Sequence, residues 1–120
     1  QEIIEALNKV AIPFSVNAVA QAGAVYSLAA QDSLQERTDE AVRERDRLTE
    51  RFAEFGVPAS EANHIWFPAS NIEQLGTPQE VAAKLAEQGA LVRAFPEGIR
   101  ISITTAEETE VLLKAWEAAF

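Results

Sequence analysis

The sequence predicts an α+β fold in which N-terminal helices precede the order β-α-β-β-α and a small, mainly antiparallel sheet is backed by helices. The first 55 residues place apolar side chains at helical spacing, and after Gly56 short apolar runs alternate with capped helical segments. The chain has 120 residues, of which 48% are hydrophobic and 24% are charged. A chain of this size buries a substantial core, so we expect residues 1–120 to form a single domain.

Two helices are expected at the start of the chain. Ile3, Ile4 and Leu7 recur at helical spacing and predict a helix over residues 1–10. Pro13 ends it, since proline disfavours helix in the residue before it. A second helix is expected over residues 15–30, with Ser15 as its cap. Its alanines and glycine allow close backbone approach, so we expect this helix to be largely buried.

A long third helix is predicted to begin at Asp32 and Ser33 and to run to Phe55. Ser33 and Glu36 have the spacing of a capping box, and Gly56 is a suitable left-handed stop. Acidic and basic residues alternate over most of its surface, which indicates a solvated face more than a partner-binding one. A helical interaction module built on residues 32–55 remains an alternative.

The second half predicts three strands and two helices. His64–Phe67 is a short apolar run and predicts a buried strand. Thr77 and Glu80 form a capping box with a proline between them, and the helix they open ends at Gly89. Further elements follow in order: a strand over 90–95, a turn over 95–98, an alternating strand over 99–104 and a final helix capped by Thr105–Glu108.

Composition narrows the classes of function. Ten basic residues against nineteen acidic ones give a net charge of -9, which disfavours a nucleic-acid partner. The chain has no cysteine, which excludes disulfides, thiolate metal sites and a cysteine nucleophile. No apolar run reaches the roughly 20 residues of a membrane span, so we expect no membrane partner and a cytoplasmic protein. The chain begins at Gln1 and contains no methionine, so we expect a processed protein or a piece of a longer one.

Several residue types that could carry chemistry have simpler explanations. His64 has no partner residue near it in sequence, so a structural role is favoured over catalysis. The acidic residues at the start of the last helix suit its dipole, which explains them better than a metal site. None of the three lysines occupies a position suited to a Schiff base. We expect four aromatic residues to lie in the core: Trp66, Phe67, Trp116 and Phe120.

The arginine pair Arg93 and Arg100 is the most informative local feature. A hairpin with its tip at Pro96 and Glu97 places the two arginines opposite each other. Like charges across a ladder are unfavourable by roughly 0.2–1 kcal/mol, so something should compensate them. An anionic ligand is one candidate, because a guanidinium matches carboxylate and phosphate geometry. Neutralisation by Glu97 or another acid, or simple solvation, is the alternative, and spacing alone favours it.

Three segments carry a resemblance to a known family. Residues 8–22 resemble the start of the C-terminal small domain of histidinol-phosphate aminotransferases, and Ala62–Phe67 resembles a strand of that domain. Residues 92–109 are similar to its closing motif. Within this motif, the sequence of residues 93–100 most resembles the aromatic-amino-acid (phenylalanine) aminotransferases, a branch found beside that family. The resemblance covers the whole chain in order.

The resemblance implies a fold, a cofactor and roles for both arginines. The family has the aspartate-aminotransferase fold and depends on pyridoxal 5'-phosphate, with its active site between a large domain and this small domain at a homodimer interface. Arg100 matches the arginine that holds the substrate carboxylate. Arg93 matches an arginine associated with the acidic end of substrate in the histidinol-phosphate enzymes, and its role toward an aromatic substrate stays open. Residues 1–14 match the hinge or linker from the large domain.

The same resemblance implies that the chain is incomplete as an enzyme. The Schiff-base lysine and the residues that bind the cofactor lie upstream in the family. We therefore expect the isolated chain to bind no pyridoxal phosphate and to be inactive, with the missing large domain and an amino-acid substrate as partners. A non-catalytic regulatory module that binds an amino acid at its sheet is the alternative.

Overall fold

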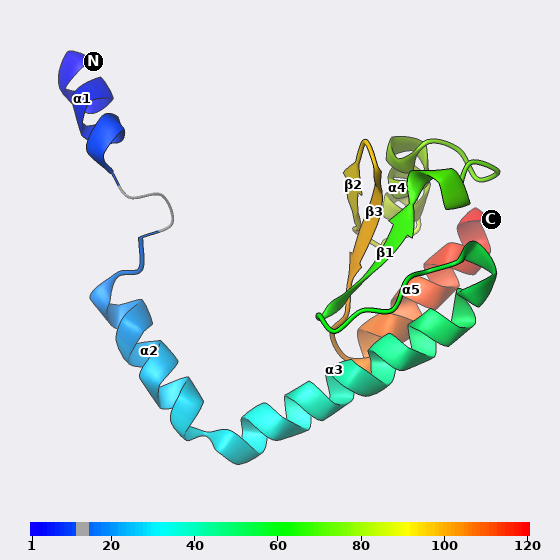
Figure 1. Ribbon diagram of the computed structural model, residues 1–120, viewed down its shortest axis with the longest axis horizontal. Helices are drawn as coiled ribbons and strands as arrows, with labels where there is room; N and C mark the ends of the chain where they lie inside the picture. The colour runs from blue at the N-terminus through cyan, green and yellow to red at the C-terminus, as the bar shows by residue number, and fades with distance from the viewer. Residues whose placement is uncertain (12–14) are drawn as a thin grey trace. The chain divides into compact units, whose positions relative to one another are not determined.

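The computed structural model describes residues 1–11 and 15–120, and the chain forms two compact units, residues 1–34 and residues 35–120 (Figure 1). Pro13, which the sequence predicts to end the first helix, lies outside the described residues. Among the residues described, none belongs to a helix that is both long enough and apolar enough to cross a membrane.

The first unit contains two separate helices and the start of a third. Helix α1 spans Glu2–Val10 and helix α2 spans Ala18–Ala29, and neither contains a buried residue. The predicted Ser15 cap is wrong, because Asn17 accepts the backbone N–H of Ala20 at 2.9 Å. The expected burial of the second helix is also wrong, since all of its residues are exposed.

Helix α3 spans Gln31–Arg51 and begins one residue before Asp32, so Ser33 is already its third residue. Ser33 therefore lies inside the first turn, and the predicted capping box is wrong. The helix also ends earlier than predicted and is followed by a 3₁₀ turn, η1, over Ala53–Phe55. Gly56 ends this segment with a φ of 59°, in the left-handed region that favours glycine, as the sequence predicts.

The second unit contains a three-stranded antiparallel sheet with the order β1-β3-β2. Strand β1 spans His64–Pro68, β2 spans Arg93–Phe95 and β3 spans Gly98–Ser102. The hairpin of β2 and β3 places Arg93 opposite Arg100, as predicted. The predicted α+β class is confirmed.

Strand β2 is shorter than the predicted strand over 90–95. The N–H of Ala90 donates to the carbonyl of Leu85 at 2.9 Å, so the end of the preceding helix holds this residue rather than the ladder. Gly89 adopts a φ of 89° at that turn. The turn that ends α4 therefore includes Ala90, and the ladder with β3 begins at Arg93.

Two helices follow the predicted caps closely. Helix α4 spans Pro78–Glu87, and Thr77 and Glu80 form both hydrogen bonds of the capping box. Bonds from the Thr77 backbone and hydroxyl lower the pKa of Glu80. Helix α5 spans Ala106–Ala119, and the Thr105 hydroxyl accepts the N–H of Glu108. A short 3₁₀ turn, η2, covers Ala69–Asn71.

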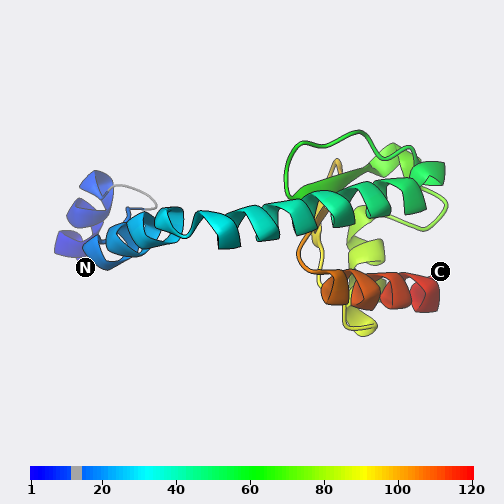
Figure 2. The same ribbon diagram turned by 90° about the horizontal axis from the view of Figure 1, so that it is seen from below.

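Helices α3 and α5 run side by side (Figure 2) and are joined at their outer edge by ion pairs. The Arg47 guanidinium lies 2.5 Å from the Glu110 carboxylate and 3.3 Å from that of Glu44. The hydrogen bond from Arg47 lowers the pKa of Glu110. The Arg47–Glu110 pair is exposed, as expected for a solvated face, whereas Glu44 is 8% exposed and belongs to the covered side of the helix.

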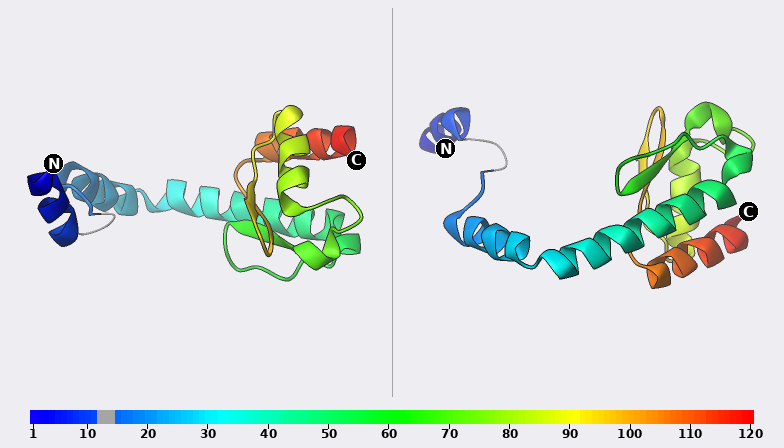
Figure 3. Two further views of the ribbon diagram at one scale, coloured as in Figure 1. Left: turned by 90° about the horizontal axis from the view of Figure 1, so that it is seen from above. Right: turned by 60° about the horizontal axis from the view of Figure 1, so that its bottom comes forward.

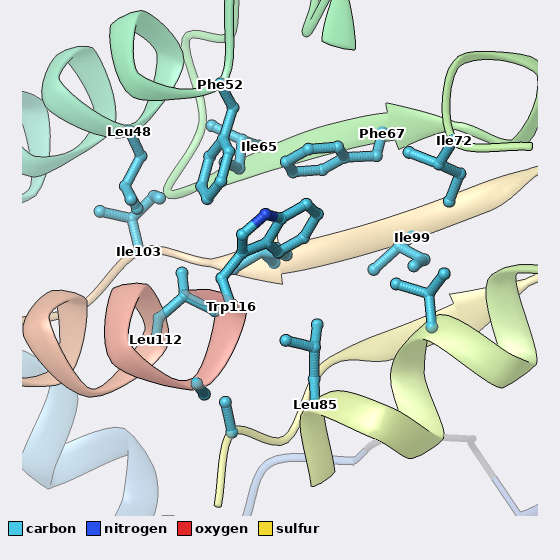
Figure 4. Close-up of a cluster of buried hydrophobic side chains, with 14 residues drawn as sticks. Leu48, Phe52, Ile65, Phe67, Ile72, Leu85, Ile99, Ile103, Leu112 and Trp116 are labelled. Atoms are coloured by element: carbon cyan, nitrogen blue, oxygen red, sulfur yellow. The ribbon is translucent and has the colours of Figure 1, made fainter. Parts of the chain in front are cut away.

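The core of this unit lies between one face of the sheet and the three helices α3, α4 and α5 (Figures 3 and 4). Phe52 at the end of α3, Phe67 from β1 and Trp116 from α5 form its aromatic centre, with ring centroids 4.7–5.4 Å apart. Aliphatic side chains from the surrounding elements enclose them: Leu48, Ile65, Ile72, Val81, Leu85, Ile99, Ile101, Ile103 and Leu112.

Candidate functional site

The candidate site lies on the face of the sheet that the helices leave uncovered, called here the outer face. Along β1 the buried residues Ile65 and Phe67 alternate with half-buried Trp66. Successive strand side chains point to opposite sides, so Trp66 lies on the outer face. The register of the sheet puts Arg100 and Arg93 on the same face, in one row with Trp66.

The three residues of this row are not equally spaced. The N–H of Ile103 donates to the Asn63 carbonyl at 2.7 Å, which marks that pair as hydrogen-bonded. Because pairs alternate along an antiparallel ladder, Trp66 and Arg100 form a non-hydrogen-bonded pair, with Cα atoms roughly 4.5 Å apart. Arg100 and Arg93 form a hydrogen-bonded pair, at roughly 5.5 Å. The nearest cross-strand neighbour of Arg100 is therefore the tryptophan.

Arg100 is partly buried and carries an unsatisfied polar atom. Its Nε is buried and has no hydrogen-bond partner within the described part of the chain. No carboxylate within the described ranges forms an ion pair with Arg100 or Arg93, and Glu97 is exposed at the tip of the hairpin. Of the alternatives that spacing alone favours, neutralisation by a nearby acid is not found among the described residues. Solvation fits the exposed Arg93 but not the buried Nε of Arg100. A cation on a sheet face without an internal counter-ion is suited to an external anion.

An aromatic pair stands beside the arginines on the same face. Trp66 and Phe95 have ring centroids 5.8 Å apart with planes tilted by 54°. The Arg93 guanidinium lies over the Phe95 ring at 5.2 Å from its centroid. This cation–π contact stabilises the charge of Arg93 and partly offsets the repulsion between the two guanidinium groups.

Gly98 makes room for this arrangement. It pairs with Pro68 on one side and Phe95 on the other, between the two aromatic residues. A Cβ at this position would lie 2.6 Å from the indole Cζ2 of Trp66 and in conflict with the Phe67 carbonyl. The indole therefore extends across β3 at a point where only glycine leaves space.

The sequence predicts both arginines and their pairing correctly, but it places only two of the four aromatic residues correctly in the core. Phe67 and Trp116 are in the core as predicted, with exposures of 0% and 6%. The prediction is wrong for Trp66, which is only half buried on the outer face, and for Phe120, which is 42% exposed. The alternation in the His64–Phe67 run is the signal that separates Trp66 from Phe67.

None of the three lysines joins this site. Lys9 and Lys114 are exposed on α1 and α5. The Lys84 ammonium donates to the Leu75 carbonyl at 3.2 Å and lies over the Phe120 ring. Across residues 1–11 and 15–120, no group of three or more metal-ligating side chains is found either. The outer face can therefore hold an anion, and the described residues contain no desolvated amine for carbonyl chemistry.

A second hollow lies elsewhere in the unit, next to the start of β2. It has a volume of about 380 Å³ and lies between the segment after α4, the end of β3 and the first turns of α5. Among the described residues that line it, Glu108 alone is charged, and this carboxylate would repel an anion. The two arginines lie outside the hollow, so it is separate from the candidate site.

Comparison with known proteins gives a consistent result. The family model for class I and II aminotransferases matches residues 1–115. A protein named aromatic amino acid aminotransferase from Corynebacterium diphtheriae is 52% identical over 119 residues, which cover 99% of this chain. Proteins of the same name from Nocardia farcinica and Mycobacterium marinum are 43% and 39% identical, each over 94% of the chain. The chain spans about a third of the length of these curated relatives, from 31% to 33%.

Proposed function

This chain belongs to the class I and II aminotransferase family, and we propose that it is the substrate-binding small domain of an enzyme that transfers an amino group between an aromatic amino acid and a 2-oxo acid. The relatives carry the name of that activity, and they are about three times as long as this chain. The substrate class is inferred from those names. The remaining two thirds, a large domain, and a second copy in a homodimer are proposed partners.

Arg100 is proposed to bind the substrate α-carboxylate, and one observation carries this role. Its guanidinium has a buried Nε with no partner, on a face where no acid among the described residues neutralises it. A carboxylate accepts two parallel hydrogen bonds from a guanidinium, which fixes both the position and the orientation of the amino acid. Fixing the substrate in this way holds its Cα proton toward the catalytic groups.

Pyridoxal phosphate, which the family implies, acts when bound as an electron sink for the carbanion at the substrate Cα. The described residues do not fit this cofactor, because none of the lysines lies on the outer face and Lys84 already binds the Leu75 carbonyl. We therefore infer that the cofactor is held by the part of the enzyme outside this chain. The role of the chain is to bind and orient the substrate, and by itself it is expected to be inactive.

Kinetics of the full-length enzyme test the role of Arg100. Replacing one charged hydrogen-bonding partner costs on the order of 1.5–3 kcal/mol, so Arg100→Gln should lower kcat/KM about 10- to 100-fold, mainly through KM. Arg43→Gln, at an exposed position on α3, is the matched control and should leave kinetics unchanged. An Arg100→Gln enzyme with the kcat/KM of the parent would refute the assignment.

A further inference from the structure

The outer face offers a second contact for the substrate besides the arginine. Resting on the function proposed above, we propose that Trp66, backed by Phe95, is the surface on which the aromatic side chain of the substrate packs while its carboxylate binds Arg100. This assigns the small domain a part in choosing the substrate as well as in holding its carboxylate.

The position of Trp66 is the first argument. It is the nearest cross-strand neighbour of Arg100, in the closer of the two pair types of the ladder. It is half buried, whereas the other tryptophan of the chain is 6% exposed and packed into the core. A large ring left partly open beside an unpaired cation has the two components that an aromatic amino acid needs.

The way the indole is held is the second argument. Gly98 leaves room for it to extend across β3, and Phe95 meets it from the far strand at 5.8 Å. Phe95 in turn has the Arg93 guanidinium over its ring. The indole therefore contacts Phe95 on one side and is half buried, so part of its surface stays accessible.

The shape of the substrate is the third argument. In an aromatic amino acid only two tetrahedral carbons separate the carboxyl carbon from the ring. A carboxylate bound by Arg100 therefore keeps the ring close to that side chain, and Trp66 is its nearest cross-strand neighbour. Offset or edge-to-face packing of two rings is favourable beyond the burial of area. An aliphatic or acidic side chain gains no such term.

Substrate preference in the full-length enzyme tests the proposal. We compare kcat/KM for phenylalanine and for leucine in Trp66→Leu, with Phe120→Leu as the control for loss of an exposed aromatic residue elsewhere. Trp66→Leu should lower kcat/KM for phenylalanine about 10-fold and change that for leucine less than about 3-fold. Trp66→Phe should restore most of the preference, and Phe120→Leu should change neither value.

Each other outcome overturns the proposal. An equal loss for both substrates means that Trp66 only supports Arg100, and an unchanged preference means that the ring binds elsewhere. Should Trp66→Leu fail to fold, tryptophan fluorescence gives the answer: phenylalanine should change the emission of the parent enzyme, and Trp66→Phe should abolish that change. Failure of the proposed function is recognised separately, because Arg100→Gln would then leave kcat/KM unchanged for both substrates.

Discussion

Residues 1–34 and residues 35–120 use similar helical signals but differ in what those helices bury. Both units contain capped helices, with Asn17 capping α2 and Thr77 capping α4. In the first unit no described residue is buried, whereas the second has a continuous core built from its sheet and long helices. Local signals are enough to start a helix, but a core needs partners that are distant in sequence.

Helix α1 of the first unit carries an exposed apolar stripe that is typical of a binding surface. Ile3, Ile4, Leu7 and Val10 recur along one side of α1, and each is between 60% and 77% exposed. A solvent-facing helix has no physical reason to keep such a stripe. The difference between the units therefore indicates that α1 presents an apolar binding surface, while residues 35–120 form the core.

Truncation of one core ring should have the largest effect. Phe52→Ala removes a fully buried ring that contacts Phe67 and Trp116, so the free energy of unfolding should fall by about 3–5 kcal/mol. Leu7→Ala, at a residue 60% exposed on α1, should change it by less than about 0.5 kcal/mol. Urea denaturation followed by tryptophan fluorescence measures both. Comparable losses for the two variants would mean that the first unit shares the core.

Removal of a helix cap should have an intermediate effect. Thr77→Ala deletes the hydroxyl that accepts the Glu80 N–H, and the free energy of unfolding should fall by about 1 kcal/mol. Ser33→Ala is the matched control, because Ser33 has the same capping-box spacing but lies inside α3. It should leave the unfolding midpoint unchanged.

The stability loss caused by Thr77→Ala should also depend on pH. Bonds from Thr77 lower the pKa of Glu80 in the folded state, so the charged form stabilises the fold above the ordinary glutamate pKa. That stabilisation is lost as the pH falls through the lowered pKa. The destabilisation caused by Thr77→Ala should therefore be full at about pH 7 and smaller near roughly pH 3. A penalty that stays constant with pH would assign the effect to the bond that the hydroxyl accepts from the Glu80 N–H, and not to its bond with the Glu80 carboxylate.

These caps also show what sequence can predict. The motifs at Ser33 and Thr77 look alike, yet only the second forms a capping box. Pro78 fixes the start of α4, since proline is favoured at the first helical position and cannot extend a helix backward. Gln31 and Asp32 set no such limit, so α3 begins earlier. A capping signal is reliable where a neighbouring residue prevents the helix from extending.

The candidate site divides in the same way. The pairing of Arg93 with Arg100 follows from turn residues and alternation within one hairpin, which are local. The position of Trp66 beside Arg100 depends on the register between β1 and β3, which are separated by helix α4 and the hairpin turn. No local pattern fixes that register. The pairing of the two arginines can therefore be predicted from the sequence. The position of the tryptophan beside them becomes visible only in the folded structure.

Deletion of residues 1–34 should have the smallest effect on folding and a clear effect on association. Residues 35–120 contain every buried residue that the structure describes, so their free energy of unfolding should change by less than about 0.5 kcal/mol. The exposed apolar residues of α1 and α2 favour self-association of the intact chain, which light scattering should detect as a mass above 13.1 kDa. The shortened chain should scatter as a monomer.

A variant with both helices still present identifies the cause. Ile4→Glu combined with Leu7→Glu places two charges in the apolar stripe of α1 without removing a backbone hydrogen bond, and glutamate is a good helix former. Monomeric behaviour of this variant would assign association to the stripe, whereas persistent association would assign it to α2 or to residues 35–120. An intact chain that stays monomeric at high concentration would contradict the prediction, because α1 would then keep an exposed apolar stripe without binding through it.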